Sequence, residues 1–196
     1  RIEEKLKMFN CSNHYKILKQ KNITIKNNNI LRIINIGSKS SKATAHINNT
    51  TIHCNIGICG SAYNKTEGDK KTPKGTFFPK KIFYRADKIQ SIKSPIKKEI
   101  IKNHYRWCDD AKSYNYNKLI PRSFNQSSET MWRNDNLYDL IITTTHNQLP
   151  IIKHKGSAIF LHINNDSKKG SLGCITFKES HLRRLILTLN VKTRIY

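Results

Sequence analysis

Short apolar runs separated by polar turn residues follow one another along most of the chain. The runs are rich in Ile and Thr, and clusters of Asn, Gly, Asp and Lys divide them, a pattern typical of β-strands joined by turns. Three consecutive asparagines, Asn27 to Asn29, separate the first two runs and predict a hairpin there. The predicted strands span residues 23–26, 30–36, 50–54, 76–84 (interrupted by Pro79), 137–145, 158–163, 174–177 and 193–196.

A segment near the end of the sequence has a helical period instead. Leu182, Leu185, Ile186 and Leu189 lie at positions i, i+3, i+4 and i+7, so residues 178–189 are predicted to form an amphipathic helix. Many short strands with one such helix favour a mainly β fold.

The domain organisation follows from where these patterns begin. We expect a single domain over residues 23–196, preceded by a leader helix or loose tail over residues 1–22. The stretch 85–129 is polar and irregular, and we expect Trp107, Tyr114 and Tyr116 to anchor it.

Composition adds a strong positive charge. The 196 residues include 36 Lys and Arg against 13 Asp and Glu, a formal net charge of +23. Such a charge suits a polyanionic partner, but Lys, Asn and Ile share A/T-rich codons, and we favour compositional drift of the genome. The basic residues are scattered and no RNA-binding motif is present, so nucleic acid is not an expected partner. No apolar run is long enough for a spanning helix, and the first residue, Arg1, is compatible with a removed signal peptide upstream.

The five cysteines cannot all pair within one chain. Cys54 and Cys59 form a C-x4-C pair without a second pair at zinc-finger spacing, so we expect no metal. A redox or zinc function for this pair remains an alternative that requires the two side chains to lie close together.

The segment around Cys174 carries the candidate chemistry. His162 is near the end of one predicted strand, and Cys174 opens the next after a run of turn formers, so a loop that folds back can bring them together. An imidazole beside a thiol can take its proton and create a nucleophilic thiolate. Gly173 permits a tight turn whose N–H groups, with that of Cys174, can face an oxyanion, and Ser171 can orient the imidazole or a substrate carbonyl. Each residue alone is more often an ordinary core or turn residue.

These residues resemble the signature of the L,D-transpeptidase catalytic domain (YkuD) family, a His followed by Ser/Thr-x-Gly-Cys. Upstream, the blocks Lys65 to Asp69 and Thr72 to Phe77 are similar to the family's Glu-Gly-Asp and Thr-Pro-x-Gly-x-Phe block. Segments 107–110, 114–117, 129–133 and 138–139 resemble its short bacterial branch.

The resemblance implies a β-sandwich catalytic domain that forms peptidoglycan cross-links without a metal or cofactor. Cys174 would form a thioester with a stem peptide, His162 would be the general base and acid, and Gly173 with Cys174 would form the oxyanion region, with Ser171 at the Ser/Thr position. Transfer to water, an L,D-carboxypeptidase activity, and a catalytically idle basic wall-binding module are the alternatives. The substrate implies a periplasmic or wall-associated location, and we expect a monomer.

The substrate-binding residues are less well defined, because Ile175 and Thr176 stand where many family members have Arg or Asn. Candidates for the group that binds the substrate carboxylate are Lys65, Arg106 and Arg133. Glu67 and Asp69 are better explained as ordering their own loop than as catalytic carboxylates. The candidate substrate-binding set is Lys65, Glu67, Gly68, Asp69, Arg133, Tyr138 and Asn147.

Overall fold

The fold was obtained as a computed structural model, which describes residues 30–37, 40–122, 124–164 and 170–196. The predicted strand 23–26, its hairpin and the leader over residues 1–22 lie outside the described residues.

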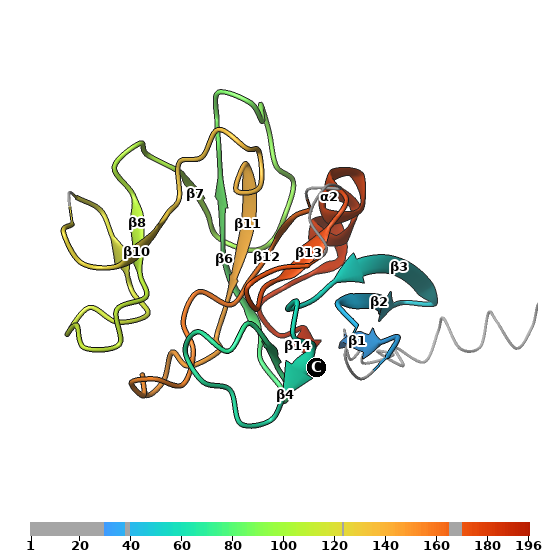
Figure 1. The fold of residues 1–196 in the computed structure, drawn as a ribbon. Coiled ribbons are helices and arrows are strands. Elements are labelled where there is room, and N and C mark those ends of the chain that lie inside the picture. Colours follow the sequence, from blue (N-terminus) through green and yellow to red (C-terminus); the bar gives the residue numbers. More distant parts are fainter. Residues whose placement is uncertain (1–29, 38–39, 123, 165–169) are drawn as a thin grey trace, which may run out of the picture.

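A nine-stranded sheet forms the centre of the molecule (Figure 1). Both parallel and antiparallel pairs occur in it, and the parallel pair β12–β13 lies near its middle. In order across the sheet the strands are β14 (Arg194–Ile195), β1 (Ile30–Asn35), β2 (Lys42–Ile47), β3 (Thr50–Asn55), β13 (Ile175–Phe177), β12 (Phe160–Ile163), β11 (Leu140–Thr144), β6 (Pro79–Tyr84) and β7 (Lys98–Ile100).

Two small sheets lie beside the large one. One has the order β10 (Ser128–Thr130), β8 (Arg106–Cys108) and β9 (Leu119–Ile120), and the other pairs β4 (Ser61–Ala62) with β5 (Thr72–Pro73). The first of these stands apart from β12 and β13 on the side away from helix α2 (Glu179–Thr188), as Figure 1 shows.

Helix α2 confirms the amphipathic prediction. Leu182, Leu185 and Ile186 are buried while Leu187 on the opposite face is exposed. The buried face joins the same core as Leu161 and Ile163 of β12. No helix among the described residues is long and apolar enough to cross a bilayer.

Two apolar cores lie on opposite faces of β12, because side chains alternate along a strand. Leu161 and Ile163 belong to the core beneath α2. Phe160 belongs to the second core, with Trp107 of β8, Tyr138 and Cys174. His162 has the same parity as Phe160 and therefore lies on the second face. The mainly β, sandwich-like prediction is confirmed.

The irregular stretch contains more structure than its pattern predicts. Strands β7 to β10 form within or at the end of residues 85–129. Trp107 and Tyr116 are buried anchors, as expected, but the prediction for Tyr114 is wrong, because its side chain is 88% exposed and stacks with Lys118. Pro79 begins β6 rather than interrupting a strand, since a proline has no N–H to offer at that position.

Candidate active site

Cys174 lies immediately before β13 and lines a cavity. Its side chain is 8% exposed. The sulfur donates a hydrogen bond to the Ala158 carbonyl at 3.0 Å and accepts one from the Phe160 N–H at 3.4 Å. Both partners belong to the chain entering β12, so the neighbouring strand holds the sulfur in place.

Burial sets the protonation of this thiol. It raises the pKa of Cys174 from 9.0 to about 12, and the nearby Glu129 adds to the rise. The Phe160 N–H and Lys65 act in the opposite direction but do not outweigh burial. The sulfur is therefore protonated at neutral pH, which agrees with its role as the donor to Ala158.

His162 lies on β12 with its ring fixed from two sides. Its Nδ1 donates to the Ile163 carbonyl at 2.8 Å, and the Tyr138 ring meets it edge-on with centroids 5.0 Å apart. Burial lowers the pKa of His162 to about 4, although the carbonyls of Ile163 and Leu137 favour the proton. The imidazole is therefore neutral at physiological pH.

The parallel register of β12 and β13 fixes the position of Cys174 relative to His162. It also corrects the geometry expected from the sequence. His162 pairs with Thr176, which places Cys174 beside Phe160, two residues back along the strand. A simple reversing loop would give antiparallel strands, so the chain crosses over instead. The thiol and the imidazole share a face and line one cavity, offset along the sheet by about 7 Å of strand rise.

Ser171 orders the turn that leads into Cys174. Its hydroxyl donates to the Cys174 carbonyl at 2.6 Å and accepts from the Gly173 N–H at 3.0 Å. The expectation that Ser171 orients the imidazole is not met in this geometry, because its hydrogen atom is directed to the backbone. Gly173 has φ +140°, and a Cβ there would lie 3.0 Å from the Lys71 carbonyl oxygen, so glycine is required.

Thr72 joins the upstream block to this turn. Its hydroxyl donates to the Gly173 carbonyl at 2.8 Å and accepts from the Gly57 N–H at 2.9 Å. A Cβ on Gly57 would lie 2.4 Å from the Lys70 carbonyl oxygen, so the two segments are in close contact. One buried hydroxyl thus explains why two sequence blocks 101 positions apart act together.

Lys65 and Asp69 form a largely buried ion pair in the loop before β5. Burial alone would raise the pKa of Asp69, but Lys65 and the N–H groups of Thr66 and Lys71 outweigh it and lower that pKa. Both residues are occupied in ordering their loop, as the simpler interpretation expects for Asp69. Glu67 and Gly68 line the cavity, and Glu67 accepts a hydrogen bond from Tyr116.

The remaining candidates divide between cavity and scaffold. Arg133 and Tyr138 line the cavity, and Arg133 is held by Asp135 through two hydrogen bonds of 2.9 and 2.5 Å. Arg106 binds backbone carbonyls of its own loop. Asn147 bonds to Ile152 and Gly156 and orders the loop before β12 instead of facing the cavity.

The cavity around Cys174 has a volume of about 470 Å³. A larger one of about 730 Å³ lies between β1, β5 and the strand β14, but its described lining holds no Cys, His, Asp or Glu. The candidate catalytic groups Cys174 and His162 therefore lie in the smaller cavity. Its polar lining also includes residues that sequence reasoning did not single out as site residues: Lys70, Asp109, Glu129, Ser157, Asn164 and Thr176.

Asp109 and Glu129 fall within segments that carry the resemblance, 107–110 and 129–133, and that was their only signal in the sequence. They converge because β8 and β10 pair, with Glu129 opposite Trp107.

The cysteine-pair alternative is not supported. Cys54 is buried and Cys59 is exposed, and both are free thiols. Burial raises the pKa of Cys54 to about 12. Among the described residues no three His, Cys, Asp or Glu side chains are grouped so that they could hold a metal ion.

Comparisons with known proteins place this geometry in context. A family model described as the L,D-transpeptidase catalytic domain, YkuD, matches residues 20–196. A solved structure, that of Bd1075 from Bdellovibrio bacteriovorus, is similar with 16% identity and a TM-score of 0.44, covering 86% of this chain and 46% of the other. The chain thus spans less than half the length of that protein. A search of curated proteins finds no match.

Proposed function

Since the chain belongs to the YkuD family of L,D-transpeptidase catalytic domains, we propose that it forms peptidoglycan cross-links through a thioester on Cys174. We take residues 23–196 as the catalytic domain. The observation that carries the proposal is that Cys174 and His162 share one face of adjacent strands and line the same cavity of about 470 Å³.

In the proposed mechanism the thiol is activated during attack rather than before it. Burial raises the pKa of the Cys174 thiol and lowers that of the His162 imidazole, so both shifts oppose proton transfer between them before a substrate binds. A standing thiolate–imidazolium pair is therefore disfavoured in this geometry. The Cys174 proton leaves Ala158 and passes to His162 as the sulfur bonds to the substrate carbonyl carbon.

The developing oxyanion needs a donor close to the sulfur. The Gly173 N–H is engaged by the Ser171 hydroxyl, so we assign the oxyanion to the Cys174 N–H. Ser171 and Gly173 then act as positioning residues that fix the direction of this donor. The tetrahedral intermediate expels the terminal residue of the stem peptide, which takes the proton from His162.

Release of the acyl group completes the proposed cycle. A side-chain amine of a second stem peptide attacks the thioester, forms the cross-link and returns the thiol. Water in place of the amine would give an L,D-carboxypeptidase. Because both substrates belong to the wall, we propose that the protein acts outside the cytoplasmic membrane and contributes to cell shape.

The decisive experiment follows the acyl-enzyme by intact-protein mass spectrometry. The purified protein is mixed with a stem tetrapeptide, and we expect a mass increase equal to the peptide minus its terminal D-alanine. Cys174→Ala should abolish the adduct and lower turnover by more than about a thousandfold. Cys59→Ala is the matched control, since Cys59 is an exposed free thiol outside the cavity lining.

An adduct that survives in a folded Cys174→Ala protein would overturn the proposed nucleophile. A wild-type protein that binds wall polymer but never acquires the adduct would favour the idle binding module. Adding an amine acceptor distinguishes transfer from hydrolysis, because the cross-linked product and the free tripeptide differ in mass.

A further inference from the structure

Asn117 is a buried polar side chain outside the cavity lining, in the segment between β8 and β9. Only 2% of it is exposed. Its backbone has φ +56°, a left-handed conformation that asparagine and glycine tolerate better than other residues. The residue joins three parts of the molecule, because its contacts reach the small sheet of β8, the loop after β11 and the chain that enters β12.

The side-chain amide of Asn117 is fully paired. Its Oδ1 atom accepts from the Trp107 indole N–H at 3.0 Å and from the Ala158 backbone N–H at 3.1 Å. Its Nδ2 atom donates to the carbonyls of His146 at 3.3 Å and Asn147 at 2.7 Å. A primary amide has two acceptor sites and two donor hydrogens, so these bonds also fix which way the amide faces.

The bond to Ala158 holds an unusual backbone conformation beside the sulfur. Ala158 has φ +49°, in the left-handed region where a residue with a Cβ is strained. Such a conformation persists only where its surroundings impose it. The N–H of Ala158 is held by Asn117, and its carbonyl accepts the Cys174 S–H at 3.0 Å. One residue therefore connects the buried amide to the proposed nucleophile.

The backbone on either side of Ala158 has separate partners. Asn147 donates to the Gly156 carbonyl at 2.9 Å, and the Thr144 hydroxyl donates at 2.6 Å to the carbonyl that follows that of Ala158. Both contacts order the chain entering β12. Neither of them restrains the N–H of Ala158, so the amide of Asn117 supplies that restraint.

We propose that Asn117 is a positioning residue for the attack of Cys174: by holding the Ala158 N–H, it keeps the adjacent carbonyl against the thiol and fixes the sulfur for its approach to the substrate. The inference deepens the proposed function and rests on it. A displacement of about 1 Å at the reacting atoms can cost about a hundredfold in rate. Asn117 does not line the cavity, so its effect passes through Ala158.

The test removes the amide with little change to the backbone. Asn117→Gly deletes the side-chain bonds, and glycine accepts the left-handed φ. Asn117→Asp keeps an acceptor for the Ala158 N–H but loses the donor to the two loop carbonyls. Gln148→Ala is the matched control, because it removes a bond to the Asn117 carbonyl and leaves the amide in place.

Infrared spectroscopy of the resting protein measures the contact at the sulfur. The S–H stretching band of Cys174 is isolated by subtracting the spectrum of the Cys174→Ala protein, and its frequency rises when the hydrogen bond to a carbonyl weakens. We expect a higher frequency in Asn117→Gly. Asn117→Asp and Gln148→Ala should keep the wild-type frequency, since both retain an acceptor for the Ala158 N–H.

Kinetics separate positioning from binding. With a saturating stem tetrapeptide, acyl-enzyme formation should slow by about tenfold or more in Asn117→Gly and by less than about threefold in the other two variants. In a Cys174→Ala background, Asn117→Gly should change the affinity for the same peptide by less than about twofold. If Asn117→Gly does not fold, Asn117→Ser takes its place, because the shorter hydroxyl withdraws the acceptor from Ala158.

A folded Asn117→Gly protein with the wild-type S–H band would overturn the inference even if its acylation were slower, because the rate loss would then come from the scaffold alone. A rate loss in Gln148→Ala as large as that in Asn117→Gly would overturn it too. Failure of the wild type to form any acyl-enzyme would instead overturn the proposed function, and the S–H band would still report whether Asn117 holds the sulfur.

Discussion

At the scale of single residues, the site holds the proposed nucleophile and the proposed base in their neutral forms. Burial raises the pKa of Cys174 and lowers that of His162. In the unliganded protein Cys174 is therefore not a thiolate and His162 is not an imidazolium. This arrangement avoids the cost of two buried charges. In the proposed mechanism, the substrate therefore has to trigger the proton transfer.

The buried imidazole of His162 makes the stability of the folded protein depend on pH in the acid range. Its pKa is about 4 in the folded protein against 6.5 for the ordinary imidazole. Between these values the unfolded chain binds a proton that the folded protein does not, so stability falls as pH drops from 6.5 toward 4. The expected contribution is about 3 kcal/mol. His162→Gln should flatten this part of the profile, measured as the urea midpoint at several pH values from 7 to 4.

The control is His104→Gln, because His104 is exposed and does not line the cavity. It should keep the wild-type slope. Equal slopes for the wild type and His162→Gln would mean that His162 is not buried in its neutral form.

Cysteine labelling provides a second expectation at this scale. Cys59 is exposed, whereas Cys174 is buried and its pKa is raised to about 12. A thiol reagent at pH 7 should modify Cys59 before Cys174, because thiolates are the reactive species and exposure controls access. Peptide mapping after brief alkylation measures the order. Preferential modification of Cys174 would show that its thiol is more acidic and accessible than this geometry allows.

At the scale of elements, a contact between two short segments fixes the turn that leads into Cys174. Thr72 holds the β5 segment to the turn before β13 through one hydroxyl with two buried partners. Thr72→Val keeps the shape but leaves a buried carbonyl and a buried N–H unpaired. We expect a loss of about 2 kcal/mol in the free energy of unfolding, and slower acylation as the Gly173 turn shifts.

Urea denaturation measures this loss as a lower midpoint with an unchanged slope. Thr76→Val is the matched control, because Thr76 is exposed in the same block and should change stability by less than about 0.5 kcal/mol. If the two variants behave alike, the Thr72 hydroxyl does not join the blocks energetically.

Strands that contain clear runs of apolar residues could be predicted from the sequence, whereas other strands could not. Residues 30–36, 50–54 and 158–163 contain β1, β3 and β12 as observed, within a residue or two. Strand β2 was missed because its inward residues include Ala43 and Ala45, which are too small to produce a clear apolar period. Register is a property of paired strands, so the parallel crossover between His162 and Cys174 had no local signal.

Site residues show the same division. Cys174, His162 and Gly173 could be identified as candidates because they lie in one short segment with a recognisable residue pattern. Their partners lie in segments that the sequence also marked, but the contacts themselves, through the Ala158 carbonyl and the Thr72 hydroxyl, had no signal in the sequence. Asn147 is a candidate substrate-binding residue by sequence, but its amide bonds to the backbone of its own loop.

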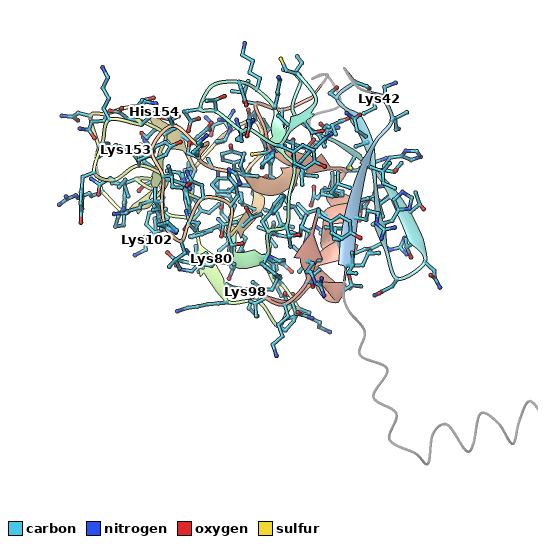
Figure 2. All side chains as sticks on the ribbon, turned by 90° about the horizontal axis from the view of Figure 1, so that it is seen from below. Lys42, Lys80, Lys98, Lys102, Lys153 and His154 are labelled. Carbon is cyan, nitrogen blue, oxygen red and sulfur yellow. The ribbon has the colours of Figure 1, made fainter. Side chains whose placement is uncertain are left out.

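At the scale of the whole molecule, the positive charge is distributed rather than concentrated. Figure 2 shows Lys42 near one end, Lys153 and His154 near the other, and Lys80, Lys98 and Lys102 between them along one edge. A charge of this kind produces a long-range attraction to polyanions without specific contacts.

We therefore expect binding to an anionic wall polymer to weaken about tenfold or more between 50 and 200 mM salt, while acylation by a short soluble stem peptide changes by less than about twofold. Parallel salt titrations of polymer retention and adduct formation measure the two effects. If acylation falls as steeply as retention, the surface charge takes part in the reaction itself.

The hydrogen bond from the Cys174 sulfur to the Ala158 carbonyl has a consequence beyond turnover. The thiolate is the form of cysteine that attacks peroxide, and the sulfenic acid formed in this first step can be oxidised further to sulfinic and sulfonic acids. A thiol kept protonated and capped by a carbonyl offers little to an oxidant. The buried, protonated thiol of Cys174 is therefore expected to react with peroxide more slowly than the exposed thiol of Cys59.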